Sequence, residues 1–429
     1  MPDGVLKRIW AGTKGPEAPR ADSVEFEEQA TLAQGRSRPA WAEIDLAAVT
    51  HNAAVLARLV QPAQLCAVVK AHAYGHGGPA VARAALAGGA IGLAVALVDE
   101  GVELRQHGVQ GPILLLSECS AEAVSTVMAH RLTPTLYTPE GIERFVEVTR
   151  AQGQRKAVHL KVDTGMHRVG AQPADVPALV KTIVDDPLLH FEGLWTHMPV
   201  ADGETENDRA FTLGQLEAFE RLRGELAGLG LTPEVLHTAN TAGAIAFPTA
   251  RYHMVRCGLG IYGHLPGPAV SRAFAATAED PLRPAMSLKA RVVSVRNLEP
   301  GERPSYGRLR PLPARSLVAT VPMGYADGVP RQLFHRGYEV LIGGVRRPLA
   351  GMVTMDQIVV DCGDDSSVRP GDEVVLLGRQ GDQEITAEDW AEMLGTISYE
   401  VLCGVGARMP RIAVNGPGRA AGSLSPPGA

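Results

Sequence analysis

Residues 64–78, QLCAVVKAHAYGHGG, decide the fold, because an apolar run passes straight into Lys70 and a glycine-punctuated loop. A short apolar run bounded by turn residues is typical of a fully buried strand. Seven more runs of this kind follow, at residues 90–95, 112–116, 132–137, 157–163, 189–197, 234–240 and 254–263. Helix-like segments such as 138–153 and 207–230 separate them. This alternation predicts a closed (β/α)8 TIM-type barrel, with a doubly wound sheet as the alternative.

After about residue 285 the pattern changes to valine-rich runs broken by Gly and Pro turns. These runs occupy residues 289–298, 316–328, 338–363 and 371–378, with one helical segment at 386–396. Such a pattern predicts a mainly β C-terminal domain. The strand-like stretch at 40–49 precedes the first barrel unit and is a candidate to pair with this domain.

The chain is therefore expected to divide into four parts. A flexible N-terminal extension covers 1–38, because these residues are polar and carry Pro, Gly and charge. The barrel covers 39–284 and the β domain 285–415. Residues 416–429 form a disordered tail.

The bulk composition excludes several classes of protein. A formal net charge of −6 without a basic run argues against a nucleic-acid or membrane-surface partner. Five scattered cysteines without a Cys-x-x-Cys pair indicate neither a disulfide framework nor a zinc site. No apolar run is long enough to span a membrane, and the first residues lack a signal-peptide core. We expect a cytoplasmic enzyme without a metal.

Catalytic groups of a barrel gather at the carboxyl ends of its strands. In this sequence those ends carry mostly cations and few free carboxylates, which favours an anionic ligand. The residues concerned are Lys70, Asp163, Arg168, His197, Thr241 and Arg256. A desolvated lysine forms Schiff bases with aldehydes. On the pattern alone, a Lys70 that pairs with a carboxylate is equally compatible.

Three other motifs carry weaker signals. His72 and His76 have the spacing of helical metal ligands, but Gly75 between them favours loop histidines. The string GLGIYG (258–263) comes too late in the chain for a dinucleotide site, and as a phosphate signal it is weak. The stretch 323–331, MGYADGVPR, which holds Tyr325 and Asp327, is typical of a tight turn.

Eight motifs together resemble the bacterial alanine racemases. They are VVKAHAYGHG (68–77), HLKVDTGMHRVG (159–170), EGLWTH (192–197), HTANTAGA (237–244), MVRCGLGIYG (254–263), GYADGVPR (324–331), GMVTMDQ (351–357) and ISYEVLCGVGARMPR (397–411). The resemblance extends from residue 40 to about 413. It implies a pyridoxal-phosphate (PLP) enzyme that interconverts L- and D-alanine and supplies D-alanine for peptidoglycan.

The resemblance also implies a role for each matching residue of the cofactor site. Lys70 resembles the lysine that holds PLP as an internal aldimine and acts on one face of the substrate. Arg256 resembles the arginine that hydrogen-bonds the pyridine nitrogen. The phosphate cradle would comprise Tyr74, Thr241 and the backbone amides of Gly258 and Leu259.

The remaining roles concern the substrate and the second base. Tyr325 resembles the base that reaches the opposite face from the partner subunit of a homodimer with shared active sites, and His197 would orient it. Arg168 and Met355 resemble the residues that bind the substrate carboxylate. Lys161 matches a lysine that is often carbamylated in this family and would hold Arg168.

Elementary chemistry agrees with these roles. Racemisation removes a proton from one face of Cα and returns it to the other, so two bases on opposite sides are a direct solution. Arginine at the pyridine nitrogen disfavours a pyridinium, because it has no proton that it readily gives up. Tyrosine ionises near pH 10, so we expect the cations His197 and Arg256 to lower the pKa of Tyr325.

Four positions depart from the family pattern. His72 stands where asparagine is common and Thr241 where serine is common. Met352 replaces an arginine, and Ala407 occupies a position where some members carry tyrosine; both concern the width of the substrate channel. The alternatives are a PLP-dependent amino-acid decarboxylase of the same fold and a broader-specificity amino-acid racemase. A decarboxylase would carry a Cys-Asp-Gly signature, but the nearest string here is VDCGDD.

Overall fold

A computed structural model describes residues 38–416. The predicted extension and tail lie outside the described residues, apart from Arg38 and Gly416. The chain divides into two compact units. Among the described residues, the barrel unit contains 48–73 and 78–283, and the C-terminal unit contains 38–47, 74–77 and 284–416.

The barrel unit has eight parallel strands, as the sequence predicted. They are β2 (Gln64–Val68), β3 (Gly92–Val95), β4 (Ile113–Leu115), β5 (Thr135–Leu136), β6 (Lys156–Lys161), β7 (Leu189–Trp195), β8 (Val235–His237) and β9 (Met254–Cys257). Two four-stranded groups, β4-β3-β2-β9 and β5-β6-β7-β8, make up the wall. The barrel closes where Leu115 N–H donates to Thr133 O (2.8 Å) and Arg256 N–H donates to Ala239 O (2.9 Å). Nearly every strand residue is buried, which explains why the strands appear as continuous apolar runs.

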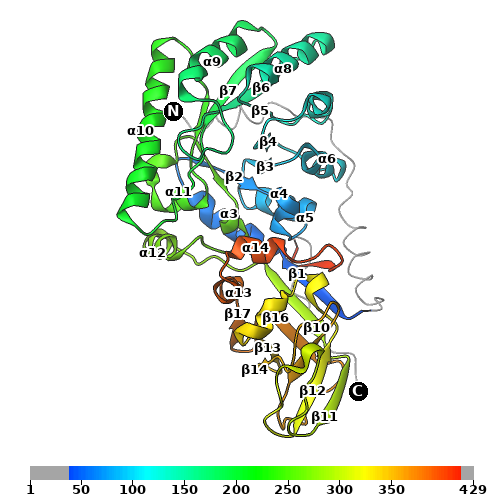
Figure 1. The fold of residues 1–429 in the computed structure, drawn as a ribbon. Coiled ribbons are helices and arrows are strands. Elements are labelled where there is room, and N and C mark those ends of the chain that lie inside the picture. The colour runs from blue at the N-terminus through cyan, green and yellow to red at the C-terminus, as the bar shows by residue number, and fades with distance from the viewer. Residues whose placement is uncertain (1–37, 417–429) are drawn as a thin grey trace. The chain divides into compact units, whose positions relative to one another are not determined.

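Helices surround these strands (Figure 1). They are α3 (Leu46–Leu59), α5 (Gly78–Ala87), α6 (Val98–Gln106), α7 (Val124–Ala129), α8 (Pro139–Gln152), α9 (Val176–Asp185), α10 (Glu206–Gly228), α11 (Thr241–Ala246) and α12 (Pro268–Thr277). Local signals set their ends. Thr138 caps α8 by accepting from Gly141 N–H, and Gly153 ends that helix in the left-handed conformation. A capping box of Thr205 and Asp208 starts α10.

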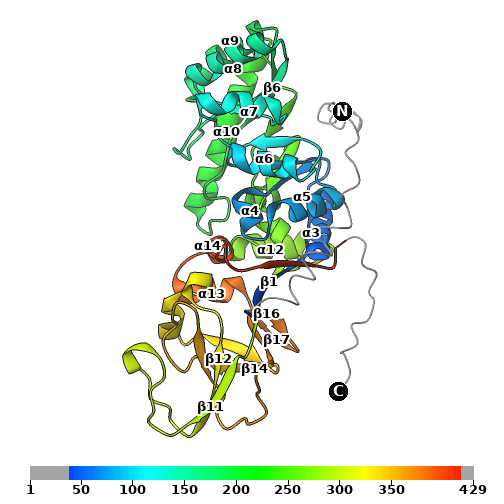
Figure 2. The same cartoon turned by 90° about the vertical axis from the view of Figure 1, so that its right-hand side faces the viewer.

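The C-terminal unit is mainly β, as the valine-rich runs predicted (Figure 2). Its larger sheet has the order β14 (Val345–Pro348), β13 (Glu339–Ile342), β16 (Glu373–Gln380), β10 (Met286–Arg291), β1 (Ala40–Asp45) and β18 (Arg411–Val414), with β17 (Gln383–Ile385) paired to β16. A second sheet contains β11 (Ser294–Leu298), β12 (Ser316–Val321) and β15 (Ile358–Asp361). The helices are α13 (Ala387–Leu394) and α14 (Ser398–Cys403).

Strand β1 belongs to this unit although it precedes the barrel in the sequence. It pairs antiparallel with β10 and parallel with β18. The expectation that the stretch at 40–49 pairs with the β domain is therefore confirmed for residues 40–45. No helix among residues 38–416 is both long and apolar enough to cross a membrane.

Candidate active site

Lys70 stands at the carboxyl end of β2 and opens an unusual turn, α4 (Lys70–Tyr74). The three central residues of this turn have φ between 49° and 55°, so the turn is left-handed. Each L-residue in this conformation costs about 1–2 kcal/mol. The turn is held by Ala71 N–H, which donates to Glu100 Oε1 (2.5 Å), and by Ala73 N–H, which donates to Val69 O (2.9 Å). Strain that is maintained in this way is typical of functional segments.

The mouth of the barrel is electropositive. Burial, together with the charges of Arg256, Arg168 and Lys70, lowers the pKa of Lys161 to about 8, although the charge of Asp163 acts in the opposite direction. The Lys161 ammonium also lies 4.7 Å from the ring centroid of Trp195. The cations that the sequence placed at separate strand ends therefore share one electrostatic environment. Such a site favours an anionic ligand.

His197 is neutral in this environment, which corrects one expectation. Burial lowers its pKa well below the ordinary value, and the positive charges of Arg256, Lys161 and Arg168 act in the same direction. Arg256 Nη2 lies 3.4 Å from His197 Nδ1. Because a guanidinium only donates, Nδ1 accepts and the ring proton resides on Nε2. His197 is therefore not the cation that the sequence led us to expect, although it can donate a hydrogen bond from Nε2.

Arg256, on β9, is only 2% exposed and is held by both terminal nitrogens. Nη1 donates to His237 Nδ1 (2.8 Å) and His237 O (3.0 Å). Nη2 donates to Thr196 O (2.7 Å) and Thr238 O (3.1 Å). The guanidinium carbon lies 4.5 Å from the Trp195 ring centroid. Within the described residues no hydrogen bond involves Nε, so this N–H is the donor that can meet a ligand.

The predicted phosphate cradle is partly assembled in the barrel unit. Thr241 opens α11 and is buried, and its Oγ1 accepts from Gly258 N–H at 3.0 Å. Leu259 follows directly and begins a short 3-10 turn, Leu259–Tyr262. Gly258 N–H is thus already engaged by Thr241, while the Thr241 hydroxyl and the adjacent backbone of Leu259 lie at the same place, where hydroxyl and amide donors suit a phosphate group.

The loop that carries Arg168 is organised by Asp163. Asp163 Oδ1 accepts from Gly165 N–H (2.9 Å) and His167 N–H (3.0 Å). The backbone of Gly170 (φ 135°) approaches Asp163 so closely that a Cβ there would lie 2.9 Å from Asp163 N. Arg168 is exposed, yet its charge acts on Lys161 and His197. The arginine therefore stands at the entrance of the cationic mouth.

Tyr325 and Met355 lie side by side in the C-terminal unit. Tyr325 N–H donates to Thr354 O (2.9 Å) and Ala326 N–H donates to Met355 O (3.1 Å). Gly324 makes the contact possible, because a Cβ there would lie 2.3 Å from Thr354 O. Both side chains are exposed, Tyr325 by 43% and Met355 by 52%. The two loops predicted to act on the substrate thus form one surface of this unit.

The buried carboxylate of Asp327 holds these two loops. From the sequence, this residue was interpreted as part of a tight turn. Asp327 accepts from Arg38 Nη2 (2.7 Å), Arg408 Nε (2.7 Å) and Gly324 N–H (2.9 Å). Arg408 Nη2 also donates to Asp356 Oδ1 at 2.7 Å. Arg408 therefore joins the Tyr325 loop to the Met355 loop. Asp327 lies in the motif GYADG and Arg408 in the motif GARMPR. The two motifs are far apart in the sequence, so the sequence alone did not indicate that these residues pair.

Tyr74 belongs to the C-terminal unit by its contacts. Its ring lies 5.8 Å from the ring of Tyr399, and Arg411 Nε donates to the neighbouring Gly75 O at 2.9 Å. Tyr399 was not singled out from the sequence, although it lies within the motif ISYEVLCGVGARMPR. Within this unit, Tyr74 therefore packs beside a second tyrosine ring.

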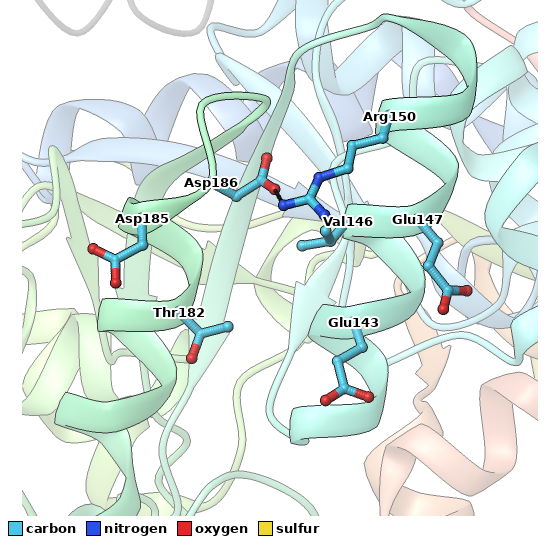
Figure 3. A pocket seen from close by; sticks show the side chains of 7 residues that line it. All are labelled: Glu143, Val146, Glu147, Arg150, Thr182, Asp185 and Asp186. Carbon is cyan, nitrogen blue, oxygen red and sulfur yellow. Dashed lines mark hydrogen bonds and ion pairs between the residues drawn. The ribbon is translucent and has the colours of Figure 1, made fainter.

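A hollow outside the predicted site lies between α8 and α9 (Figure 3). Its lining is mainly acidic: Glu143, Val146, Glu147, Arg150, Thr182, Asp185 and Asp186. Arg150 already pairs with Asp186 at 2.6 Å, and none of the lining residues was predicted to be functional. Within residues 38–416, no group of three or more His, Cys, Asp or Glu residues is arranged to bind a metal ion.

Comparison with known proteins gives a consistent result. Residues 44–266 match the family model of the alanine racemase N-terminal domain, and residues 285–413 match that of the C-terminal domain. The alanine racemase of Symbiobacterium thermophilum is 45% identical over 374 residues, which is 87% of this chain and 97% of that protein. The alanine racemase of Bacillus anthracis with bound L-Ala-P has a TM-score of 0.80 at 32% identity, covering 88% of this chain and 96% of that one. A histidine racemase from Leuconostoc mesenteroides has a TM-score of 0.79 at 30% identity, covering 88% and 98%.

These features define a fold-type III PLP enzyme. The chain has a barrel and a β domain, and the barrel carries a lysine after its first strand, an electropositive mouth and the Thr241–Gly258 corner, where a hydroxyl meets backbone amides. The residues fit the cofactor, since Lys70 suits its aldehyde, the Thr241–Gly258 corner its phosphate and Arg256 Nε its pyridine nitrogen. The chain belongs to the alanine racemase family and is a PLP-dependent amino-acid racemase, an isomerase.

Proposed function

We propose that this protein interconverts L- and D-alanine with Lys70 and Tyr325 as the two bases, and that it supplies D-alanine for peptidoglycan. The observation that carries the proposal is the buried Arg256, whose Nε is the donor left for the cofactor. PLP supplies the electron sink for the carbanion formed at Cα. Lys70 removes or returns the Cα proton on one face, and the Tyr325 hydroxyl does so on the other.

The remaining residues bind and orient. The Arg168 guanidinium and the Met355 backbone amide hold the substrate carboxylate, which fixes Cα between the bases. His197 donates from Nε2 to the Tyr325 oxygen and keeps it directed toward Cα. Tyr74, Thr241, Gly258 and Leu259 bind the cofactor phosphate. An arginine in place of a carboxylate at the pyridine nitrogen disfavours the decarboxylase alternative, because it keeps that nitrogen unprotonated.

Lys161 suits carbamylation. Its pKa of about 8 leaves part of the amine neutral near physiological pH, and the neutral amine is the form that attacks CO2. The resulting carbamate would bear a negative charge among Arg168, Arg256 and Lys70. It would therefore offset the repulsion in the mouth and hold Arg168.

We further propose a cytoplasmic homodimer in which Tyr325 of one subunit completes the site of the other. Tyr325 and Met355 are exposed on the same surface of the C-terminal unit, which supports a role at an interface. Two-fold symmetry then produces two equivalent sites.

Racemisation assays on a panel of L-amino acids, read by chiral chromatography, test the substrate. We expect alanine to react fastest and serine second, because the cations bind the substrate carboxylate and add no favourable contact for a long side chain. Lysine, arginine or histidine racemised as fast as alanine would contradict this and favour a broader specificity. Histidine belongs in the panel because a histidine racemase shares the fold.

A further inference from the structure

A row of buried polar side chains leads from Arg256 into the barrel. Arg256 donates from Nη1 to His237 Nδ1 (2.8 Å), and His237 Nε2 lies 2.9 Å from His159 Nδ1. His159 Nε2 in turn lies 2.9 Å from Glu192 Oε2. The four residues come from β9, β8, β6 and β7, and none is more than 6% exposed. Apart from Arg256, the predicted roles include none of them.

The barrel is built to accommodate this row. A Cβ on Gly193 would lie 2.3 Å from His159 Nδ1, so only glycine leaves room for the imidazole on the adjacent strand. The Trp195 ring stacks on His237, with centroids 5.6 Å apart and an interplanar angle of 15°. The same indole contacts the Arg256 guanidinium. Both histidine rings are therefore fixed in position by their packing.

The chemistry of the two ends determines every proton between them. A guanidinium only donates, so His237 Nδ1 must accept. A carboxylate only accepts, so His159 Nε2 must donate. One proton remains for the contact between the rings, and it must be carried by His237 Nε2. A second proton on either ring, or a reversed tautomer, would place two N–H groups face to face.

The electrostatics of His237 agree with a neutral ring at that position. Burial lowers the pKa of His237 well below its ordinary value, with Arg256 and His159 acting in the same direction. The geometry also determines the state of Glu192: because His237 Nε2 donates to His159 Nδ1, the proton of His159 is on Nε2, and Glu192 Oε2 accepts from it as a carboxylate. The row is therefore a buried ion pair, Arg256 with Glu192, joined by two polarised imidazoles.

We propose that Glu192, His159 and His237 are positioning residues that hold Arg256 as a cation with its Nε directed at the pyridine nitrogen. The proposal rests on the role of Arg256 in the proposed function. Glu192 sets the direction of the hydrogen bonds, because an acceptor-only end prevents His237 from turning an N–H toward Arg256. The Arg256 terminal nitrogens then stay engaged with His237 and the backbone carbonyls.

Neutron diffraction from holoenzyme crystals in D2O tests the proton positions directly. We expect deuterium on Nε2 of His159 and His237 and none on Nδ1 of either ring. A deuteron on Nδ1 of either histidine overturns the proposal. The result does not depend on catalysis, so failure of the proposed function would instead appear as wild-type enzyme that does not racemise alanine.

A Glu192→Gln substitution tests the effect on the site. The amide has the shape of the carboxylate but can also donate, so the direction of the row is no longer enforced. We expect kcat to fall about tenfold with KM nearly unchanged, in the range seen when residues that orient a ligand are lost. The cofactor absorption band should change as well, since Arg256 is less firmly held. An unchanged kcat and an unchanged band overturn the proposal.

Two further variants separate positioning from general damage. Glu118→Gln also alters a partly buried carboxylate of the barrel unit, which accepts from Tyr137 N–H and Thr138 N–H, and it should leave the kcat and the cofactor band unchanged. In an Arg256→Lys background, Glu192→Gln should have little further effect, because it acts through Arg256. Additive losses in the double variant would overturn the proposal.

Discussion

Lys70 follows β2, and Arg256 lies on β9, which pairs with β2 in parallel. The strand pairing therefore brings the residue expected to hold the cofactor aldehyde close to the one expected at its ring nitrogen. Their different environments suit different tasks. Lys70 opens a strained turn at the mouth, whereas Arg256 is immobilised by side-chain and backbone acceptors.

At the residue scale, Lys70→Ala should abolish covalent attachment of the cofactor and lower racemisation by at least ~100-fold, since a general base is lost. Borohydride reduction followed by peptide mass spectrometry should place the cofactor on Lys70 in the wild type. Lys181→Ala, which removes an exposed lysine paired with Asp185, is the control and should retain the label. A Lys70→Ala enzyme that keeps the reduced label and full activity would contradict the assignment.

Arg256→Glu should raise the ratio of keto-acid release to racemisation. A carboxylic acid at the pyridine nitrogen favours its protonation and a longer-lived carbanion, which allows transamination. Racemisation should fall about tenfold or more. The assay counts keto acid and inverted amino acid in one reaction. An unchanged ratio with an unchanged racemisation rate would remove this role of Arg256.

At the scale of an element, the left-handed turn α4 offers a test of strain. The His72 side chain is 76% exposed, and its ion pair among residues 38–416 is a 3.7 Å contact with Glu103, so substitutions act mainly through the backbone. We expect His72→Asn to be more stable than His72→Val by about 1 kcal/mol, because asparagine tolerates φ near +50° and a β-branched residue does not.

The comparison is made by urea unfolding of the holoenzyme. The matched control places the same two residues at Glu147, which is exposed on the right-handed helix α8. Asparagine and valine have similar helix propensities, so the two variants should differ little there. Equal differences at positions 72 and 147 would show that α4 stores no strain in solution.

Asp327 makes the stability of the Tyr325 and Met355 loops depend on pH. Burial opposes its charge, but hydrogen bonds from Arg38, Arg408 and Gly324 N–H outweigh this and lower its pKa below the ordinary value. A lowered carboxyl pKa gives stability that is present above the unfolded-state pKa of about 4. That stability is lost as the pH falls through the lower, folded-state pKa.

Asp327→Asn should therefore weaken the loops by more than ~2 kcal/mol at neutral pH, because two arginines lose a buried partner. The difference from wild type should shrink in acid, where Asp327 itself becomes protonated. Hydrogen exchange of residues 322–328, compared between the two proteins at each pH, measures it. The control Asp356→Asn removes an exposed partner of Arg408 and should have a much smaller effect. A pH-independent difference would contradict the prediction.

At the scale of the whole molecule, Lys70 belongs to the barrel unit and Tyr325 to the C-terminal unit. If the site is shared across a two-fold axis, Lys70→Ala and Tyr325→Ala homodimers should each be nearly inactive. In a mixed dimer one site collects both substitutions and the other collects neither. After random exchange half of the dimers are mixed, so roughly a quarter of wild-type activity should return.

Subunit exchange is verified by native mass spectrometry of differently tagged chains. Each variant mixed with itself is the control and should stay inactive. If exchange is complete and no activity returns, both bases act within one chain.

The sequence by itself determined the eight barrel strands, helices such as α8 and α10, the change to a β domain and the family. These features depend on periodicity, caps and turn residues that act over a few positions, as at Thr138 and Gly153. It also placed Lys70 and Arg256 at strand ends, because the order of parallel strands brings those ends together.

Only the tertiary structure decided the features that depend on distant residues. The neutral His197 results from burial and from cations on other strands, and the row from Arg256 to Glu192 joins residues up to 78 positions apart in one hydrogen bond. The pairing of β1 with β18 and the Arg38–Asp327 contact span still longer separations. The left-handed turn at Ala71–Ala73 had no local signal, since alanine favours right-handed helices and surrounding contacts override that preference. The local sequence pattern reflects the conformational preferences of neighbouring residues. Protonation and backbone strain depend instead on the distant residues that folding places around a group.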